Sequence, residues 1–395
     1  MKKVAFFSLP ARSVVNTLDP LLRELAIEGC EVLYFNTPAY NEGRQENFRF
    51  IDYSPFKDGY DVASFQDGTS YFRMAQMLAN TMESVLDHVV DLLRIEAPDV
   101  IIHSHLAPWG KLVASILDLP GVCLYSTFVL APDLMLPFLR KKTSGGTDFS
   151  NILLAHKTNK KIAQCYDRYD VIPVPDIWQM YVNSEPLNIS FILPPFQPHH
   201  ELLEDPCFHV GYPTEMYEDL TDRKLIYVSL GTVFNKEVDQ MKAILGALSS
   251  VTSEVVISAG ASKGPLDEIN DNPNIRIETF TDQVDVLRRS RLFISHGGMA
   301  SVQEAVYHLT PLIVIPKIPE QELTAERVEQ LGIGVHLPEQ ALTSARLAKT
   351  IVTVLASYDQ HILRLQELLK AGVDVAPHRQ GVQLIKEHVQ ETANS

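Results

Sequence analysis

The sequence is poor in basic residues and in cysteine. Its 34 Lys and Arg residues are outnumbered by 49 Asp and Glu, which gives a formal charge of -15 at pH 7. Nucleic acids and anionic membranes are bound by clustered basic side chains, so this balance argues against both kinds of partner. The four cysteines lie far apart and form no CxxC pair. We therefore expect neither a disulfide framework nor a structural metal site.

Long apolar runs are also missing. No stretch of about 18 uninterrupted apolar residues is present, so no membrane-spanning helix is predicted. The apolar run at residues 4–9 ends at Pro10, which is more typical of a first buried strand than of a secretion signal. We expect a cytoplasmic protein whose partners are small molecules, and the oligomeric state stays open.

What the chain does have is length and a repeated layout. Its 395 residues, 46% of them hydrophobic, exceed the usual size of one core and predict two domains. An apolar run, a loop of small residues, an amphipathic helix and a second apolar run occur in this order twice. The copies have their apolar runs at residues 4–9 and 31–35, and at residues 225–230 and 254–259. Such short buried strands between helices predict parallel sheets covered on both faces.

The predicted fold class is α/β, with two Rossmann-like, doubly wound parallel-sheet domains that face a central cleft. We assign residues 1–205 to the N-terminal domain and residues 206–223, which are polar and contain Pro and Gly, to a linker. The C-terminal domain is predicted at residues 224–375. Residues 376–395 are predicted to form a helix that crosses back to the N-terminal domain.

The most informative motif is LFISHGGMASVQE, which joins a buried strand to a helix through two glycines. Gly297 and Gly298 let the backbone approach an anion, and the N–H groups at the start of the helix favour a phosphate there. His296 ends the strand, and Ser301 adds a hydroxyl within the first turn. Glu304, one turn further on, is placed to accept hydrogen bonds from a ribose diol.

Two more loops follow strands of the same predicted sheet. The segment VSLGTVF supplies Gly231 and Thr232, and LIVIPKIPEQ supplies Lys317, Glu320 and Gln321. Because the carboxyl ends of parallel strands meet at one edge of the sheet, the three loops should converge. The sequence therefore predicts a site for the diphosphate of a nucleotide.

These residues resemble the bacterial, macrolide-type branch of the UDP-sugar-dependent glycosyltransferases, which have the GT-B fold. The resemblance rests on SLGTVFN, on PNIRIETFTDQVDVL and on HGGMxSxxEAxYxxxPLxVIPxxPEQ, and it covers most of residues 222–335. It implies that a UDP-sugar or TDP-sugar is the donor and that a small lipophilic natural product is the acceptor, bound by the N-terminal domain. No metal is expected.

The resemblance also implies roles for single residues. His296 and Ser301 would hold the diphosphate, and Glu304 would hold the ribose. Phe280, beside Gln283, would border the uracil. The pair that would hold the sugar hydroxyls is Glu320 and Gln321.

Three positions of the donor half depart from the family pattern. Ala300 stands where the family usually has Asn, Lys317 stands where it has Gln, and Asp282 stands where it has Pro. Lys317 could add positive charge near a phosphate, whereas Asp282 could oppose it.

The usual proton-accepting pair is predicted to be absent. The family removes the acceptor proton with a His after the first strand, which an Asp orients. The family pattern GHVNPTLPL corresponds here to SVVNTLDPL, which places Val14 where the His belongs. The pattern PDxIIYDS corresponds to PDVIIHSH, which places Ser104 where the Asp belongs. A valine cannot take a proton, so the standard base is lost at this position.

Three hypotheses follow from this loss. In the first, the protein is a glycosyltransferase that uses a substitute base, with His103 and His105 as candidates, or that acts on an acidic acceptor such as a phenol, carboxylate or thiol. In the second, the fold serves another reaction on a bulky natural product, held by the apolar segment at residues 127–139. In the third, the protein is a non-catalytic partner. The retained donor residues favour the first hypothesis.

Overall fold

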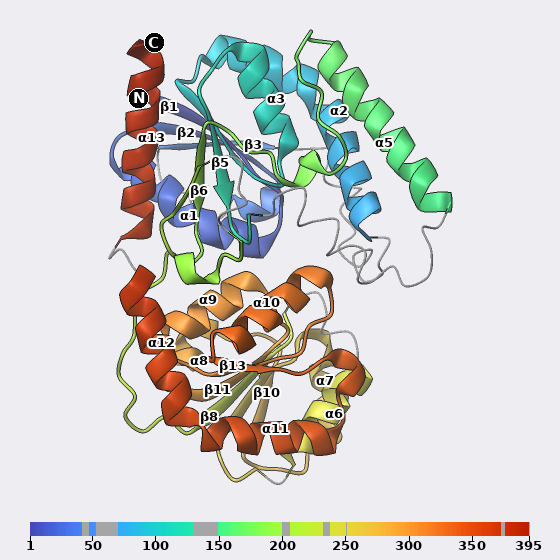
Figure 1. The fold of residues 1–395 in the computed structure, drawn as a ribbon, viewed down its shortest axis with the longest axis vertical. Coiled ribbons are helices and arrows are strands. Elements are labelled where there is room, and N and C mark those ends of the chain that lie inside the picture. Colours follow the sequence, from blue (N-terminus) through green and yellow to red (C-terminus); the bar gives the residue numbers. More distant parts are fainter. Residues whose placement is uncertain are drawn as a thin grey trace. The chain divides into compact units, whose positions relative to one another are not determined.

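The chain forms two compact units, residues 1–213 with 373–395, and residues 214–372. The computed structural model describes residues 1–41, 47–52, 70–129, 149–199, 206–231, 238–249, 251–372 and 376–394. Each unit is built on a parallel sheet with helices on both faces (Figure 1), which confirms the predicted fold class of two Rossmann-like domains.

The first unit has a seven-stranded sheet in the order β3-β2-β1-β4-β5-β6-β7, and all of its strand pairs are parallel. Its strands are β1 (Lys3–Phe7), β2 (Glu31–Asn36), β3 (Phe48–Asp52), β4 (Val100–Ser104), β5 (Gly121–Tyr125), β6 (Leu187–Ser190) and β7 (Cys207–His209). Its α-helices are α1 (Arg12–Ile27), α2 (Ser70–Glu96), α3 (Pro108–Leu117), α5 (Phe149–Asp167) and α13 (Pro377–Asn394).

The side chains of this sheet alternate between two apolar clusters, as the pleat of a strand requires. Ala5 and Ile101 pack with α2 and α3 on one face. Phe6 and Ile102 pack with α1 and α13 on the other face, where Val382 of α13 is also buried. The C-terminal helix therefore completes the core of the first unit by packing against α1 (Figure 1).

One assigned boundary needs correction. The predicted linker at residues 206–223 includes β7 (Cys207–His209), which pairs with β6 as the last strand of the first sheet. Asn188 of β6 also donates a hydrogen bond to the carbonyl of Pro206 at 3.2 Å. A strand of three residues is too short to show an apolar alternation, which is why the sequence pattern missed it.

The second unit has a six-stranded parallel sheet in the order β10-β9-β8-β11-β12-β13. Its strands are β8 (Leu225–Ser229), β9 (Val255–Ser258), β10 (Ile275–Glu278), β11 (Ser290–Ser295), β12 (Leu312–Val314) and β13 (Gly334–His336). Its α-helices are α6 (Val238–Leu248), α7 (Lys263–Asp267), α8 (Gln283–Arg289), α9 (Met299–Tyr307), α10 (Pro319–Gln330), α11 (Ser344–Ala356) and α12 (Tyr358–Gly372). The helices α6 and α11 cover one face, where Ile244 and Ile351 pack on strand residues such as Val228.

The strand order places both predicted sites at comparable points of the two sheets. In the first unit, β2 and β3 are added on one side of β1, and the later strands, starting with β4, are added on its other side. The second unit has the same switch between β8 and β11. Loops that leave such a pair run to opposite faces, and ligands of doubly wound sheets bind where they diverge. No helix among those described is long and apolar enough to cross a membrane.

Candidate functional site

The predicted diphosphate loops leave neighbouring strands of the second unit. β8 and β11 are paired up to Ser229 and Ser295, so Gly231 and His296 follow two adjacent strand ends. β12 pairs with β11 on its other side, where Ser295 lies opposite Val314. The strand pairing therefore brings the three loops to one edge of the sheet, as expected from their positions in the sequence.

The ring of His296 fills the space that two glycines leave open. A Cβ atom at Gly231 would lie 2.7 Å from His296 Cε1, and a Cβ atom at Gly298 would lie 2.8 Å from His296 Nε2. Gly231 also has a φ of +77°, which L side chains rarely adopt. In addition to letting the backbone approach an anion, these two glycines make room for the histidine.

Burial determines the charge of His296. It lowers the pKa of the ring to about 4, and the positive charge of Lys317 acts in the same direction. His296 is therefore neutral at pH 7 and can donate one hydrogen bond. Lys317, at the exit of β12, is itself only 8% exposed.

The start of α9 presents backbone donors at the same edge. Gly297, with a φ of +88°, turns the chain between β11 and α9, and a Cβ atom there would lie 2.7 Å from Val314 Cγ1. Gly298 is the N-cap of α9, and it has no side chain to cap the helix. The first N–H groups of a helix lack partners within it, so they can bind an anion.

Three predicted donor-site residues, assigned to the diphosphate, the ribose and the base, form one hydrogen-bonded group. Gln283 Nε2 donates to Glu304 Oε2 at 2.6 Å and to Ser301 Oγ at 3.0 Å. Tyr227 extends the group, because its hydroxyl lies 2.8 Å from Thr281 Oγ1 and donates to Gln283 Oε1 at 3.4 Å. The structure thus brings together Gln283, Ser301 and Glu304.

Sequence reasoning missed Tyr227. It lies in β8, is fully buried, and stacks on Phe293 with 4.8 Å between the ring centroids. A tyrosine in an otherwise aliphatic buried strand needs a partner for its hydroxyl, and this was the available signal.

Two residues near α8 lie at the surface. Phe280 is 65% exposed in the loop after β10. Asp282 accepts a hydrogen bond from the Asp285 N–H at 3.1 Å and so caps α8. The departure from the family's proline at this position therefore has a local explanation, because aspartate is a favoured N-cap residue.

Gln321 uses its side-chain carbonyl within its own loop. Its Oε1 accepts hydrogen bonds from the N–H groups of Lys317 at 2.9 Å and Ile318 at 3.4 Å. A contact of Gln321 with a sugar hydroxyl would thus rely on its amide N–H groups. Glu320 lies beside it, partly exposed, in the first turn of α10. The predicted ligand Thr232 and residues 130–139 of the apolar segment lie outside the described residues.

In the first unit, the positions of the usual proton-accepting pair are both buried. Val14 of α1 belongs to the apolar cluster of Phe6 and Ile102. Ser104 ends β4, and its buried Oγ has no hydrogen-bond partner among the described residues. By the alternation of β4, Ser104 points to the same face of the sheet as Ile102 and therefore toward the side of α1. Neither residue can accept a proton as the family's histidine does.

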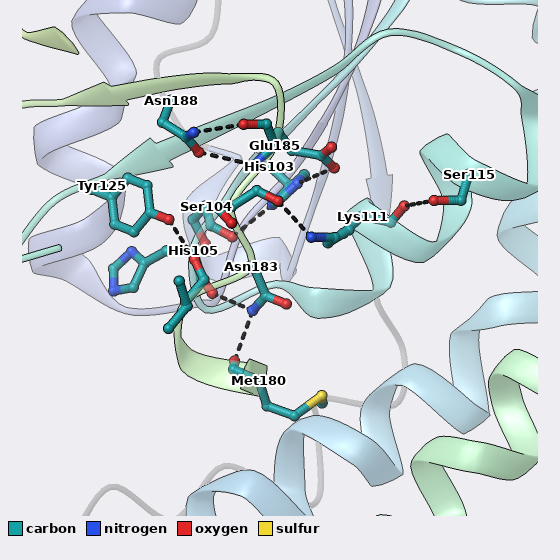
Figure 2. Close-up of polar contacts among 12 residues, drawn as sticks. His103, Ser104, His105, Lys111, Ser115, Tyr125, Met180, Asn183, Glu185 and Asn188 are labelled. Atoms are coloured by element: carbon teal, nitrogen blue, oxygen red, sulfur yellow. Dashed lines mark hydrogen bonds and ion pairs between the residues drawn. The ribbon is translucent and has the colours of Figure 1, made fainter. Parts of the chain in front are cut away.

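His103 is held in a buried hydrogen-bonded pair with Glu185 (Figure 2). Its Nε2 lies 3.0 Å from Glu185 Oε1, its Nδ1 lies 3.1 Å from the Ser104 carbonyl oxygen, and the side chain is fully buried. Cβ atoms at Gly110 and Gly121 would lie 2.5 Å from His103 Cβ and from Glu185 Oε2 respectively. The pair fits between these glycines, and both ring nitrogens of His103 are engaged.

His105 has different surroundings. Its ring stacks on Tyr125 with 5.2 Å between the centroids, and its Nδ1 has no hydrogen-bond partner in the part of the chain that the structure describes. The residue is 4% exposed, and this burial lowers its pKa to about 4. His105 is therefore neutral at pH 7 and accepts a proton poorly.

The segment from Met180 to Glu185, here called the clamp segment, holds this edge of the first unit together (Figure 2). Asn183 Nδ2 donates to the His105 carbonyl at 2.6 Å, and Tyr125 donates to the Val182 carbonyl at 2.5 Å. Lys111 Nζ donates to the Ser184 carbonyl at 2.5 Å. Sequence reasoning missed the clamp segment, because partners as far apart in the chain as His103 and Glu185 share no local pattern.

Within the described residues, no group of three or more His, Cys, Asp or Glu side chains is arranged to hold a metal ion. Among the described residues, the two edges carry the buried Lys317 and the imidazoles of His105 and His296, which are neutral at pH 7.

Comparison with known proteins yields consistent relatives. The family model described as UDP-glucoronosyl and UDP-glucosyl transferase matches residues 211–381. The NDP-glycosyltransferase YjiC of Bacillus subtilis (strain 168) is 30% identical over 376 residues, which cover 92% of this chain and 91% of that protein.

Solved structures show the same architecture. The glycosyltransferase of kitacinnamycin superposes with a TM-score of 0.81 at 21% identity. The superposition covers 98% of this chain and 99% of the kitacinnamycin enzyme's chain. Spinosyn rhamnosyltransferase SpnG, complexed with thymidine diphosphate, superposes with a TM-score of 0.71 at 20% identity, covering 97% of this chain and 100% of that chain. At these identities the likeness establishes the GT-B fold.

Proposed function

The chain belongs to the UDP-glycosyltransferase family and is a glycosyltransferase, and on this premise we propose that it transfers a sugar from a nucleoside-diphosphate sugar to an acidic group of a natural product. The acceptor is a phenol, a carboxylic acid or a thiol, and it reaches the reaction already ionised. The usual proton-accepting pair of the family takes no part.

The donor side of this proposal is supported by the second unit. His296, Lys317 and the first N–H groups of α9 supply the donors that a diphosphate needs. Glu304, held by Gln283, would accept hydrogen bonds from the ribose, and the exposed ring of Phe280 would stack on the base. The SpnG structure with thymidine diphosphate supports a UDP-sugar or a TDP-sugar as the donor.

The acceptor side is carried by one observation, which is the arrangement around Ser104. Val14 and Ser104 cannot take a proton, His103 is paired with Glu185, and His105 has a pKa of about 4. A general base is most effective when its pKa lies near the working pH, which His105 does not meet, and both ring nitrogens of His103 are already engaged by Glu185 and the Ser104 carbonyl. An acceptor that loses its proton to water removes the need for a base. The similarity to the kitacinnamycin glycosyltransferase supports a natural product, which we expect to be lipophilic.

The test is the pH dependence of kcat/KM with two phenols of different pKa. If the acceptor must ionise by itself, the midpoint of each profile follows the pKa of the phenol used. A midpoint that stays the same for both phenols would instead reveal a base on the enzyme and would overturn the proposal. Efficient transfer to an aliphatic alcohol at pH 7 would overturn it as well.

A gain-of-function variant provides an independent check. The double substitution Val14→His and Ser104→Asp restores the family's pair, and it should raise transfer to an aliphatic alcohol by about 100-fold, which is typical of a positioned base. The variant must first be shown to fold and to bind UDP. If such a sample gains no activity toward the alcohol, the missing pair is not what limits the acceptor.

A further inference from the structure

Lys317 lies at the exit of β12, where the resembling family has a glutamine. We propose that Lys317 is a catalytic residue whose ammonium group contacts the diphosphate and stabilises the negative charge that builds up there as the sugar leaves. This inference rests on the proposed function, and it names the group that assists departure of the nucleotide.

The strand pairing holds Lys317 close to His296. β12 is tied to the end of β11 by a hydrogen bond from the Ile315 N–H to the Ser295 carbonyl at 2.8 Å. Lys317 follows Ile315 by two residues, and its own N–H is held by Gln321 Oε1 at 2.9 Å. Its positive charge depresses the pKa of His296, as expected of a cation close to the ring.

The charge balance of the site singles out Lys317. Of the predicted donor-site residues that the structure describes, Lys317 is the only one with a positive charge at pH 7, because His296 is neutral there. The side chain is 8% exposed, so water screens its charge less than it would at the surface. A diphosphate bound at the start of α9 would meet this charge beside a helix end that also favours anions.

The proposed reaction needs a cation at this place. The ionised acceptor oxygen or sulfur forms a bond to the anomeric carbon with its own electron pair. The bond from that carbon to the β-phosphate oxygen breaks, and its electron pair stays on the oxygen. The negative charge of the acceptor therefore ends on the diphosphate, and no proton moves. A fixed cation beside the diphosphate lowers the barrier because its interaction grows as this charge develops.

Binding measurements can detect this role without an acceptor. UDP carries more negative charge on its β-phosphate than UDP-glucose does, so Lys317 should favour UDP. In calorimetric titrations of the full-length chain, Lys317→Gln should weaken UDP binding by about 10-fold or more and UDP-glucose binding by less than about threefold. With a phenol acceptor, kcat should fall by about 100-fold with little change in the KM of the donor.

Two variants serve as references. Lys317→Arg keeps the charge and should retain most of the preference for UDP. Lys349→Gln removes the same charge from an exposed position of α11 in the same unit, and it should leave both affinities unchanged. If Lys317→Gln folds poorly, Lys317→Met provides an apolar side chain that suits the buried position. That variant can be titrated with UDP and UDP-glucose in the same way.

The outcomes separate this inference from the proposed function. An unchanged ratio of UDP to UDP-glucose affinity in a folded Lys317 variant would overturn the role of Lys317 and leave the proposed function standing. If the unaltered protein bound none of UDP, TDP and their glucose conjugates, the proposed donor site would fall, and the inference with it.

Discussion

The two units present polar side chains at the same topological position, but they use them differently. In the first unit, His103, Tyr125 and Lys111 are hydrogen-bonded to Glu185 and to carbonyl groups of the clamp segment. In the second unit, Gly231 and Gly298 leave space for the ring of His296, and the start of α9 presents backbone donors. An edge whose polar groups bond to one another stabilises the fold, whereas an edge with glycines and a helix N-terminus is suited to a ligand.

Removing Glu185 should give the largest effect, which is a loss in the free energy of unfolding. Glu185→Leu leaves the buried His103 ring without the carboxylate that it is hydrogen-bonded to, which should cost about 3 kcal/mol, the upper end for such a buried contact. Urea unfolding of the variant should show this loss, while the Kd of UDP stays unchanged because the second unit is intact. The matched control is Glu215→Leu, which removes an exposed partner of Arg288 and should change stability by less than about 1 kcal/mol. Equal losses in the two variants would contradict the structural role of the buried pair.

His296→Ala should give the next largest effect, and it should act on binding. The variant loses a donor for the diphosphate, so the Kd of UDP should rise by about 100-fold, which corresponds to about 2.8 kcal/mol. Calorimetric titration measures this change, and His361→Ala in α12 provides a histidine control outside the predicted donor site. An unchanged Kd in a folded sample would remove His296 from the proposed donor site.

The two buried histidines should make stability depend on pH in both units. The pKa of His105 and that of His296 are lowered from 6.5 to about 4, so the unfolded chain binds more protons than the folded chain between these values. Stability is fully present above about pH 6.5 and falls toward pH 4, by up to about 1.4 kcal/mol per pH unit for each residue. Urea unfolding at pH 7.5 and at pH 5 should show a smaller difference in His105→Gln and in His296→Gln. The same slope in both variants and in the unaltered protein would contradict the lowered pKa values.

Tyr227→Phe should give the smallest effect. The variant loses the hydroxyl that supports Thr281 and Gln283, and through Gln283 it loosens Glu304. The Kd of UDP should rise by about fivefold, the equivalent of one hydrogen bond. Deoxyuridine diphosphate lacks the 2′-hydroxyl and should lose less affinity. Equal losses for the two nucleotides would mean that Tyr227 affects the unit as a whole and not the ribose contacts.

The sequence predicted those parts of the structure that local patterns encode. The buried strands and their glycine loops predicted the parallel sheets and the convergence of the three loops at one sheet edge. Gln283 donates hydrogen bonds to both Ser301 and Glu304, a contact that the motif did not predict. Their contact with a nucleotide stays a prediction.

The features that the sequence did not reveal depend on tertiary contacts. Glu185 reaches His103 from 82 positions away, and the clamp segment contains neither regular strand nor α-helix from which a pattern could be recognised. The strand β7 is defined by its pairing with β6 and not by its three residues alone. Lowered pKa values at His105 and His296 likewise come from burial, which only the folded chain produces.

The docking of α13 has a consequence for the order of events during synthesis. Gly381 of α13 lies so close to Leu21 that a Cβ atom there would come within 2.6 Å of Leu21 Cδ1. The helix α13, which completes the core of the first unit, is thus translated about 350 residues after α1, the helix that it covers. Residues 214–372, by contrast, form an uninterrupted unit. On the ribosome, the unit that is translated later can therefore fold to completion first, and the earlier unit exposes apolar surface of α1 until α13 emerges.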